Sequence, residues 1–223
     1  MVVNERHRPW QGVVMVDMQV DFFNDAELER CREDLVTTCN RLVDAALQRG
    51  LPVIEIRTVH RRDGSTWALN MVDDGAGMTI EGTAGAAPVD GLHHAGCTGD
   101  VALVTKTRDS AFHGTDLSDL LAAHGVESFL LCGVSTESCI AATATDAYAR
   151  DLSVAVVLDA TASVRWDLHD HTLAGLRAQY RQPSLSADEA IVALADAPPG
   201  SAVGADRSST AARWGGDPGA GPT

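Results

Sequence analysis

Three residues whose side chains can together perform nucleophilic chemistry follow short apolar runs of the chain. Asp17 ends the run 13–16, while Lys106 and Cys139 come just after two later runs. A thiol in the first turn of a helix, where Cys139 is expected, faces unpaired N–H groups and the positive end of the helix dipole, which lower its pKa. A carboxylate can take the thiol proton and an ammonium can stabilise the thiolate. The set therefore predicts nucleophilic catalysis by Cys139.

Each of the three also has an ordinary structural interpretation. At its position, Cys139 could equally be a buried structural cysteine. Asp17 is also typical of a helix N-cap or a solvated turn, and Lys106 is also typical of an exposed turn. The combination favours a site, because three strand ends bring a carboxylate, an ammonium and a thiol to one edge of one sheet.

The elements that must position these residues alternate between strand and helix. Continuous apolar runs predict strands buried on both faces. The expected strands are 13–16, 51–56, 101–104, 128–132 and 154–158. The expected helices are 28–48, 116–124, 137–150, 167–179 and 187–195. This order predicts an α/β protein with three layers and a doubly wound, mostly parallel sheet of about six strands, whose ligands bind at the carboxyl ends of the strands.

Two further segments complete the predicted organisation of a single domain over residues 1–196. The insertion 59–100 is rich in Gly and Asp and is long enough to be a lid or binding loop. The segment 197–223 is rich in Gly, Pro, Ser and Ala, which predicts a disordered tail. A Gly-x-Gly-x-x-Gly motif is missing after the first strand, so no dinucleotide cofactor is expected.

Composition and charge exclude several classes of partner. The 223 residues hold 17 Lys and Arg against 31 Asp and Glu, a formal net charge of −14, which disfavours binding to nucleic acid or to an anionic membrane. No apolar run approaches the roughly 18–20 residues of a membrane span, and the N-terminus does not resemble a signal peptide. We therefore expect a cytoplasmic protein that acts on a small molecule.

The cysteines are five in number and lack CxxC spacing, which disfavours both a disulfide framework and a clustered zinc site. They are Cys31, Cys39, Cys97, Cys132 and Cys139. Cys132 lies inside an apolar strand and is typical of a core residue. A cysteine that matters for function is thus expected to act as a free thiol.

From about residue 12 to 195 the chain resembles the isochorismatase-like cysteine hydrolases, which include nicotinamidases, N-carbamoylsarcosine amidohydrolase, ureidoacrylate and maleamate amidohydrolases and streptothricin hydrolase. The resemblance depends on three motifs in the same order. They are Val-Asp-Met-Gln-Val-Asp-Phe at 16–22, Lys-x-Arg-x-Ser-Ala-Phe-x-Gly-Thr-x-Leu at 106–117, and Gly-Val-Ser-Thr at 133–136 through Cys139, followed by Ala-Thr-Ala-x-x-Ala at 142–147.

The resemblance implies a catalytic triad of Asp17, Lys106 and Cys139. It also implies a non-proline cis peptide between Val134 and Ser135, with the N–H groups of Ser135 and Cys139 forming an oxyanion hole. The predicted reaction is hydrolysis of a small-molecule C–N bond of the amide, lactam, carbamoyl or ureide type through a thioester. Family members commonly form dimers or tetramers, so a homo-oligomer is expected.

The sequence departs from the metal-dependent nicotinamidases in the stretch after the second strand. Those relatives place Asp-x-His and a further His there as ligands for a divalent metal, whereas this chain has Thr58 at the Asp position and His60 after it. His93 and His94 are adjacent in a Gly-rich stretch and are typical of a solvated surface. A metal-dependent nicotinamidase is therefore disfavoured and no metal is expected, although His60 remains a possible ligand.

Two other function classes remain open. A vinyl-ether hydrolase of the isochorismatase type would use Asp17 and Lys106 without the thiol, and a non-catalytic member would bind a small molecule without turnover. Side chains near the motifs are candidates for contacts with substrate: Gln19, Phe22, Trp67, Phe112 and His113. Acidic residues in the insertion would favour a cationic substrate if they faced the site, but solvated surface is their more common role.

Overall fold

A computed structural model describes residues 9–94 and 101–196 of the chain. The predicted tail at 197–223 and the end of the predicted insertion lie outside these residues. The described strands are β1 (Val13–Val16), β2 (Val53–Thr58), β3 (Val101–Lys106), β4 (Ser128–Val134), β5 (Ser153–Ala162) and β6 (Ser184–Leu185). They form one parallel sheet in the order β3-β2-β1-β4-β5-β6. The predicted doubly wound α/β fold is confirmed.

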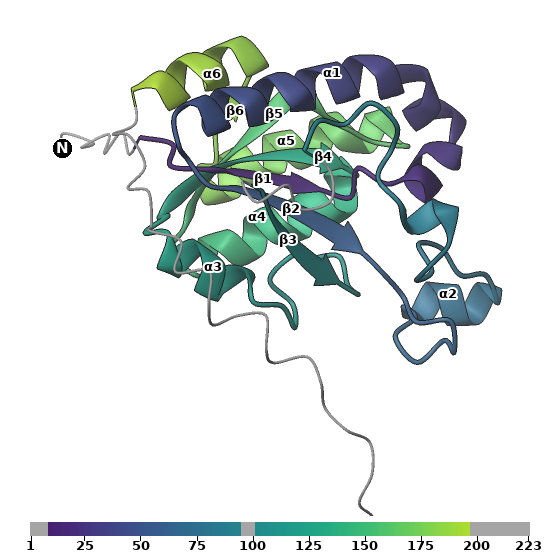
Figure 1. The fold of residues 1–223 in the computed structure, drawn as a ribbon. Coiled ribbons are helices and arrows are strands. Elements are labelled where there is room, and N and C mark those ends of the chain that lie inside the picture. The colour runs from purple at the N-terminus through teal and green to yellow at the C-terminus, as the bar shows by residue number, and fades with distance from the viewer. Residues whose placement is uncertain (1–8, 95–100, 197–223) are drawn as a thin grey trace, which may run out of the picture.

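Helices cover both faces of this sheet (Figure 1). The helices are α1 (Ala26–Gln48), α2 (Leu69–Asp74), α3 (Leu117–Ala123), α4 (Ala141–Tyr148), α5 (Trp166–Tyr180) and α6 (Ala187–Ala195). One core cluster joins α1 and α6 to one face of the sheet, and a second joins α3, α4 and α5 to the other. Among the described helices, none is long and apolar enough to cross a membrane.

Local sequence explains where α1 begins and ends. Asp25 caps its first turn, because its carboxylate accepts a hydrogen bond from the Glu27 N–H at 2.8 Å, which satisfies a donor that has no partner within the helix. Gly50 follows the helix with a φ of 66°, a left-handed conformation that glycine adopts without steric cost. α6 begins with a capping box between Ser186 and Glu189, in which two such donors are satisfied reciprocally.

Several predicted boundaries differ from the structure. The second strand is Val53–Thr58 rather than 51–56, and β5 continues past 158 to Ala162. The single helix expected at 137–150 is instead a π-helical turn, η3 (Thr136–Ile140), followed by α4. The short β6 was not among the predicted strands. The shifted end of β2 and the longer β5 contain polar residues that find partners inside the fold, namely Arg57, Thr58 and Asp159, which hydropathy alone does not show.

The insertion leaves the body of the molecule after β2 and carries α2 at its outer side (Figure 1). An isolated bridge between His60 and Ile80 holds its two ends together, and a second between Gln19 and Pro88 joins it to the body. Two 3-10 turns, η1 (Val20–Asn24) and η2 (Ala84–Ala86), lie where it meets the segment after β1. The insertion is therefore attached next to the carboxyl end of β1.

Candidate active site

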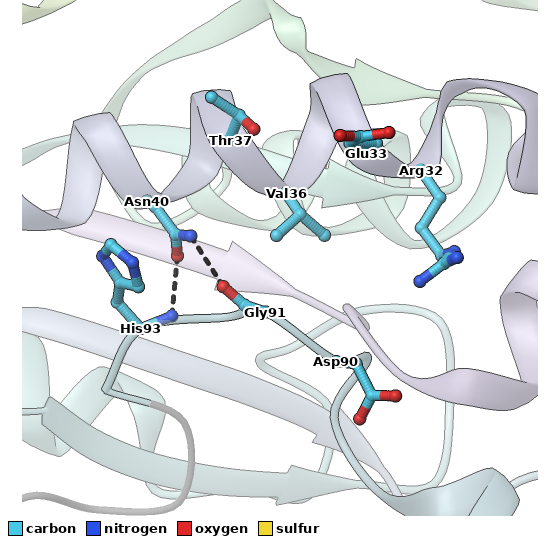
Figure 2. A pocket seen from close by; sticks show the side chains of 8 residues that line it. All are labelled: Arg32, Glu33, Val36, Thr37, Asn40, Asp90, Gly91 and His93. Carbon is cyan, nitrogen blue, oxygen red and sulfur yellow. Dashed lines mark hydrogen bonds between the residues drawn. The ribbon is translucent and has the colours of Figure 1, made fainter.

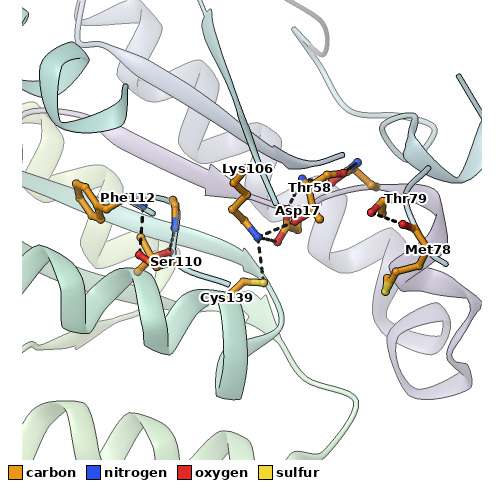
Figure 3. Close-up of polar contacts among 11 residues, drawn as sticks. Asp17, Thr58, Met78, Thr79, Lys106, Ser110, Phe112 and Cys139 are labelled. Carbon is orange, nitrogen blue, oxygen red and sulfur yellow. Dashed lines mark hydrogen bonds and ion pairs between the residues drawn. The ribbon is translucent and has the colours of Figure 1, made fainter. Parts of the chain in front are cut away.

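Asp17, Lys106 and Cys139 meet at the carboxyl ends of the strands (Figure 3). The Lys106 Nζ lies 2.7 Å from Asp17 Oδ2 and donates a hydrogen bond to Cys139 Sγ at 3.2 Å. Asp17 follows β1, Lys106 ends β3, and Cys139 lies in η3 after β4. All three are buried, with exposed fractions of 0%, 1% and 5%. The structure thus brings together the carboxylate, ammonium and thiol that the sequence singled out.

The switch point of the sheet explains this meeting. β1 lies between β2 and β4, and the chain winds outward from it in opposite directions on its two sides. In open α/β sheets, ligands bind at the carboxyl ends of strands next to such a point. Asp17 and the turn that carries Cys139 flank it, because they follow β1 and β4 respectively.

Two backbone features allow β1 and β4 to end so close together. Gly133 has a φ of 112° and pairs with Val16, and a Cβ on Gly133 would overlap the Val16 carbonyl oxygen. Only glycine allows both that conformation and that close approach. Asp17 itself has a φ of 54°, a left-handed conformation that is uncommon for a non-glycine residue and is found at functional sites. The cis peptide implied by the family resemblance is present between Val134 and Ser135.

Thr58, the last residue of β2, joins Asp17 to Lys106. Its N–H and its hydroxyl both donate to Asp17 Oδ1 at 2.9 Å, and its Oγ1 accepts from Lys106 Nζ at 2.7 Å. From the sequence, Thr58 is marked only by its place at the position of a metal ligand in relatives. Its register with Lys106, which brings the two side chains together, is visible only in the sheet.

Burial changes the expected protonation of the thiol. Burial and the neighbouring Asp17 charge raise the pKa of Cys139 well above its ordinary value, although Lys106 lowers it. The prediction of a lowered pKa at a helix start is therefore wrong, because desolvation outweighs the dipole. Burial lowers the pKa of Lys106, but its interactions with Asp17 and Cys139, which include hydrogen bonds to both, outweigh this and the net shift is upward. The resting site therefore holds a neutral thiol beside an ammonium.

The five predicted substrate contacts occupy different environments. Gln19 is fully buried: its Nε2 donates to the carbonyls of Thr58 at 2.8 Å and Ala86 at 2.9 Å, and its Oε1 accepts from the Thr58 N–H at 2.9 Å. Because the whole amide binds main chain, Gln19 supports Thr58 from behind, and its expected contact with substrate loses support.

The aromatic candidates lie mostly in packing positions. Phe112 is 5% exposed and packs in a core cluster, and the Arg150 guanidinium stacks on its ring at 4.8 Å; its contact with substrate also stays a prediction. Phe22 is half-buried against the core beside α1. Trp67 donates through Nε1 to the Arg61 carbonyl within the insertion, and His113 is exposed. Contacts of Phe22, Trp67 and His113 with substrate stay predictions.

The residues at the nicotinamidase metal position do not fit a metal site. The Thr58 hydroxyl is occupied by Asp17 and Lys106, and the His60 Nδ1 lies 2.9 Å from the Thr66 carbonyl oxygen. Burial lowers the pKa of His60. Across residues 9–94 and 101–196, no group of three or more His, Cys, Asp or Glu side chains is arranged to hold a metal ion.

A separate pocket of about 410 Å³ lies along α1 (Figure 2). Its lining residues are Arg32, Glu33, Val36, Thr37, Asn40, Asp90, Gly91 and His93. The Asn40 amide closes one end, because it donates to the Gly91 carbonyl and accepts from the His93 N–H, both at 2.8 Å. No residue of the triad lines this pocket, so it is distinct from the Cys139 site.

Comparisons with known proteins agree with this geometry. An isochorismatase domain model matches residues 11–188. A probable inactive nicotinamidase from Arabidopsis thaliana is 35% identical over 165 residues, which cover 71% of this chain and 83% of that protein. Streptothricin hydrolase from Streptomyces noursei is 31% identical over 157 residues, which cover 70% of this chain and 56% of that protein.

A crystal structure of an isochorismatase family protein from Desulfovibrio vulgaris subsp. vulgaris str. Hildenborough superposes with a TM-score of 0.74. It is 29% identical, and the match covers 84% of this chain and 100% of that one. The domain match spans the sheet and all three residues of the site. The chain belongs to the isochorismatase family of hydrolases.

Proposed function

We propose that this protein hydrolyses a C–N bond of a small amide, lactam, carbamoyl or ureide compound, with Cys139 as the nucleophile. The observation that carries the proposal is the buried Lys106 ammonium, which touches both the Asp17 carboxylate and the Cys139 sulfur. A neutral thiol needs a base next to it to become a nucleophile, and a carboxylate in the same cluster can serve as that base.

The reaction begins with transfer of the Cys139 proton to Asp17 as the sulfur attacks the substrate carbonyl carbon. Lys106 keeps its proton and offsets the negative charge that forms on the sulfur. The tetrahedral intermediate then expels the amine, which takes the proton from Asp17, and a thioester on Cys139 remains. Water attacks the thioester while Asp17 accepts one of its protons, and the proton returns to the sulfur as the acid leaves.

The raised pKa of Cys139 is consistent with this sequence of steps. A thiol that is protonated at rest is protected from oxidants and becomes reactive only when its proton moves to a base. Family resemblance assigns the oxyanion to the N–H groups of Ser135 and Cys139. Such a pair of donors is worth about 3–4 kcal/mol per donor in comparable sites.

The name of one relative supports the bond type. Streptothricin hydrolase, at 31% identity, is similar to this chain over most of the domain. The printed name of the Arabidopsis relative, a probable inactive nicotinamidase, makes a test of activity essential. The same triad geometry with no turnover would indicate a protein that binds a small molecule without reacting.

The test is release of ammonia or amine from a panel of N-carbamoyl compounds, small primary amides, ureides and streptothricin. Wild type is compared with Cys139→Ala, which leaves a small cavity and keeps Asp17 and Lys106. We expect turnover in the wild type, loss of turnover in the variant, and similar thermal melting of both. Intact-protein mass spectrometry during turnover should show the added acyl mass on wild type alone.

Two outcomes would overturn the proposal. Equal turnover by wild type and Cys139→Ala would assign the chemistry to Asp17 and Lys106, and a vinyl-ether substrate would then be the one to examine. Binding of panel compounds with no product from either protein would indicate a non-catalytic member of the family.

A further inference from the structure

Thr58 ends a strand of the sheet at a place from which its side chain touches both charged groups of the site. Asp17 follows β1 and Lys106 ends β3, and β2 lies between these two strands. Thr58 is in register with Lys106. Side chains two residues apart on a strand share a face. A side chain at the end of β2, on the face that holds Ile56, can therefore reach both the carboxylate and the ammonium (Figure 3).

Counting donors and acceptors fixes the direction of each hydrogen bond at Thr58. An ammonium can only donate. Thr58 Oγ1 must therefore accept from Lys106 Nζ, which lies at 2.7 Å. The single hydroxyl proton is then free for Asp17 Oδ1, at 2.9 Å. The hydroxyl thus accepts from the cation and donates to the anion, and its orientation is set by both.

This arrangement makes the two oxygens of Asp17 different from each other. Oδ1 accepts two hydrogen bonds from Thr58, one from its N–H and one from its hydroxyl. Oδ2 lies 2.7 Å from Lys106 Nζ, and apart from this ion pair it has no hydrogen-bond partner in the described part of the chain. Oδ2 is therefore the oxygen with room to take a proton.

The same arrangement orients the ammonium. A lysine ammonium has three N–H bonds, and the three acceptors around Lys106 Nζ are Thr58 Oγ1, Asp17 Oδ2 and Cys139 Sγ. If the hydroxyl were absent, one N–H of a buried ammonium would lose its acceptor, and the group could turn away from the sulfur. Gln19 holds the Thr58 peptide on both sides, which keeps the hydroxyl in place.

We propose that Thr58 is a positioning residue: its hydroxyl holds Asp17 so that Oδ2 faces the thiol, and it holds Lys106 so that one N–H stays on Cys139. Thr58 does not itself touch the substrate in this scheme. The inference rests on the proposed function for its effect on turnover. Its effect on the reactivity of the thiol does not depend on the identity of the substrate.

The test compares Thr58→Val with Thr58→Ser. Valine has the shape of threonine and suits a strand, but it lacks the hydroxyl, whereas serine keeps the hydroxyl and lacks the methyl group. The first readout is the rate of Cys139 alkylation by iodoacetamide at one fixed pH, followed by peptide mass spectrometry. Cys31 on α1, which is partly exposed, serves as the internal reference in every sample.

We expect Thr58→Val to slow alkylation of Cys139 roughly 10- to 100-fold relative to Cys31, the effect of losing one hydrogen bond to a charged group. Thr58→Ser should stay within roughly threefold of wild type. On any panel compound that the wild type hydrolyses, Thr58→Val should lower kcat by a similar factor and leave KM within about twofold. A residue with a merely structural role would not separate the two variants in this way.

A matched control is available at Thr161, another buried threonine in a strand. Its hydroxyl has no hydrogen-bond partner among the described residues. Thr161→Val therefore removes an unsatisfied polar group and should leave the alkylation rate unchanged. Thr58→Ala is measured as well, with melting curves for all variants, in case valine at position 58 disturbs packing. Alanine should slow alkylation as valine does.

Wild-type alkylation rates in both Thr58→Val and Thr58→Ala would overturn the inference. Equal slowing in Thr58→Ser and Thr58→Val would overturn it too, because the methyl group rather than the hydroxyl would then be responsible. If Cys139→Ala retained turnover while the Thr58 variants showed the expected alkylation pattern, the proposed function would fail and the role of Thr58 would stand.

Discussion

The two faces of β2 each hold a buried charge arrangement, and they differ in what they leave available. On the face toward α1, Arg57 donates two hydrogen bonds to Glu55, at 2.6 and 2.8 Å, and the side chains are 14% and 3% exposed. On the other face, Thr58 connects Asp17 to Lys106. Both oxygens of Glu55 accept from the Arg57 guanidinium, and we call this bidentate pair closed because its two hydrogen bonds run between its own members.

The arrangement of Asp17, Thr58 and Lys106 on the other face, which we call open, is the one that can react. Its members come from three strands, and the cation has one N–H left for the sulfur of Cys139. Apart from its ion pair with Lys106, Asp17 Oδ2 also has no hydrogen-bond partner among the described residues. A buried ion pair between neighbours on one strand neutralises charge, whereas a pair assembled across strands can keep a donor and an acceptor directed at a third group.

The largest effect is expected from breaking the open arrangement with Lys106→Met. Asp17, which is fully buried, would then be a carboxylate without its cation. Such a loss typically costs about 3–5 kcal/mol of unfolding free energy. Turnover should also be lost, because no cation would offset the charge on the sulfur. Urea unfolding followed by circular dichroism measures the first effect, and the amide panel measures the second.

The double variant Asp17→Asn with Lys106→Met serves as the control for this experiment. It removes both charges, so it should recover a large part of the lost stability and none of the activity. A single Lys106→Met variant that unfolds at the urea concentration of the wild type would contradict the importance of the ion pair.

The raised pKa of the Cys139 thiol predicts how its reactivity depends on pH. Burial and the Asp17 charge raise the pKa of Cys139 well above its ordinary value, so the thiolate fraction at neutral pH is small and grows as pH rises. The rate of iodoacetamide alkylation in the free protein should therefore increase by up to about tenfold per pH unit through the neutral and mildly alkaline range. Peptide mass spectrometry across pH measures it.

A plateau of the Cys139 alkylation rate below neutral pH would show that the thiolate is already formed at rest. That result would contradict both the raised pKa and the need for Asp17 as a base. Free cysteine under the same conditions supplies the reference curve, which should level off near its ordinary pKa of about 8.5.

The smallest of these effects is expected on the closed face of β2. Arg57→Met removes the bidentate partner of Glu55. The loss should lower the free energy of unfolding by roughly 1–3 kcal/mol. Turnover should stay within about twofold of wild type, because both side chains lie on the face of β2 opposite Thr58. A loss of kcat comparable to that of Lys106→Met would show that the two faces of β2 are coupled and that the comparison is wrong.

The predicted strands stopped short where polar residues begin, and the structure explains why. The strand expected at 51–56 continues to Thr58 because Arg57 finds Glu55 on one face and Thr58 finds Asp17 and Gln19 on the other. β5 likewise continues beyond Asp159 and pairs again with β4 through Thr161 and Ala162. For Arg57 and Thr58, hydropathy shows only that the residues are polar, and their hydrogen-bond partners are known only from the fold.

For the site residues too, some features could be predicted from the sequence and others could not. The triad could be predicted because strand ends and family motifs are visible along the chain, and the structure brings the three side chains together. Gln19 and Phe112 were predicted to touch substrate, yet one holds main chain and the other packs in the core. Their motifs mark positions that matter to the site without saying which way the side chains point.

The layers of the fold and the residues that bear reactive groups could be predicted from the chain alone, because apolar periodicity and side-chain chemistry are local properties. The order of strands is not local: β2 lies between β1 and β3 only in the folded protein, and the Thr58 hydroxyl therefore bridges Asp17 and Lys106. Burial likewise raises the pKa of the Cys139 thiol only in the folded protein, since desolvation is a sum over neighbours that are distant in the chain.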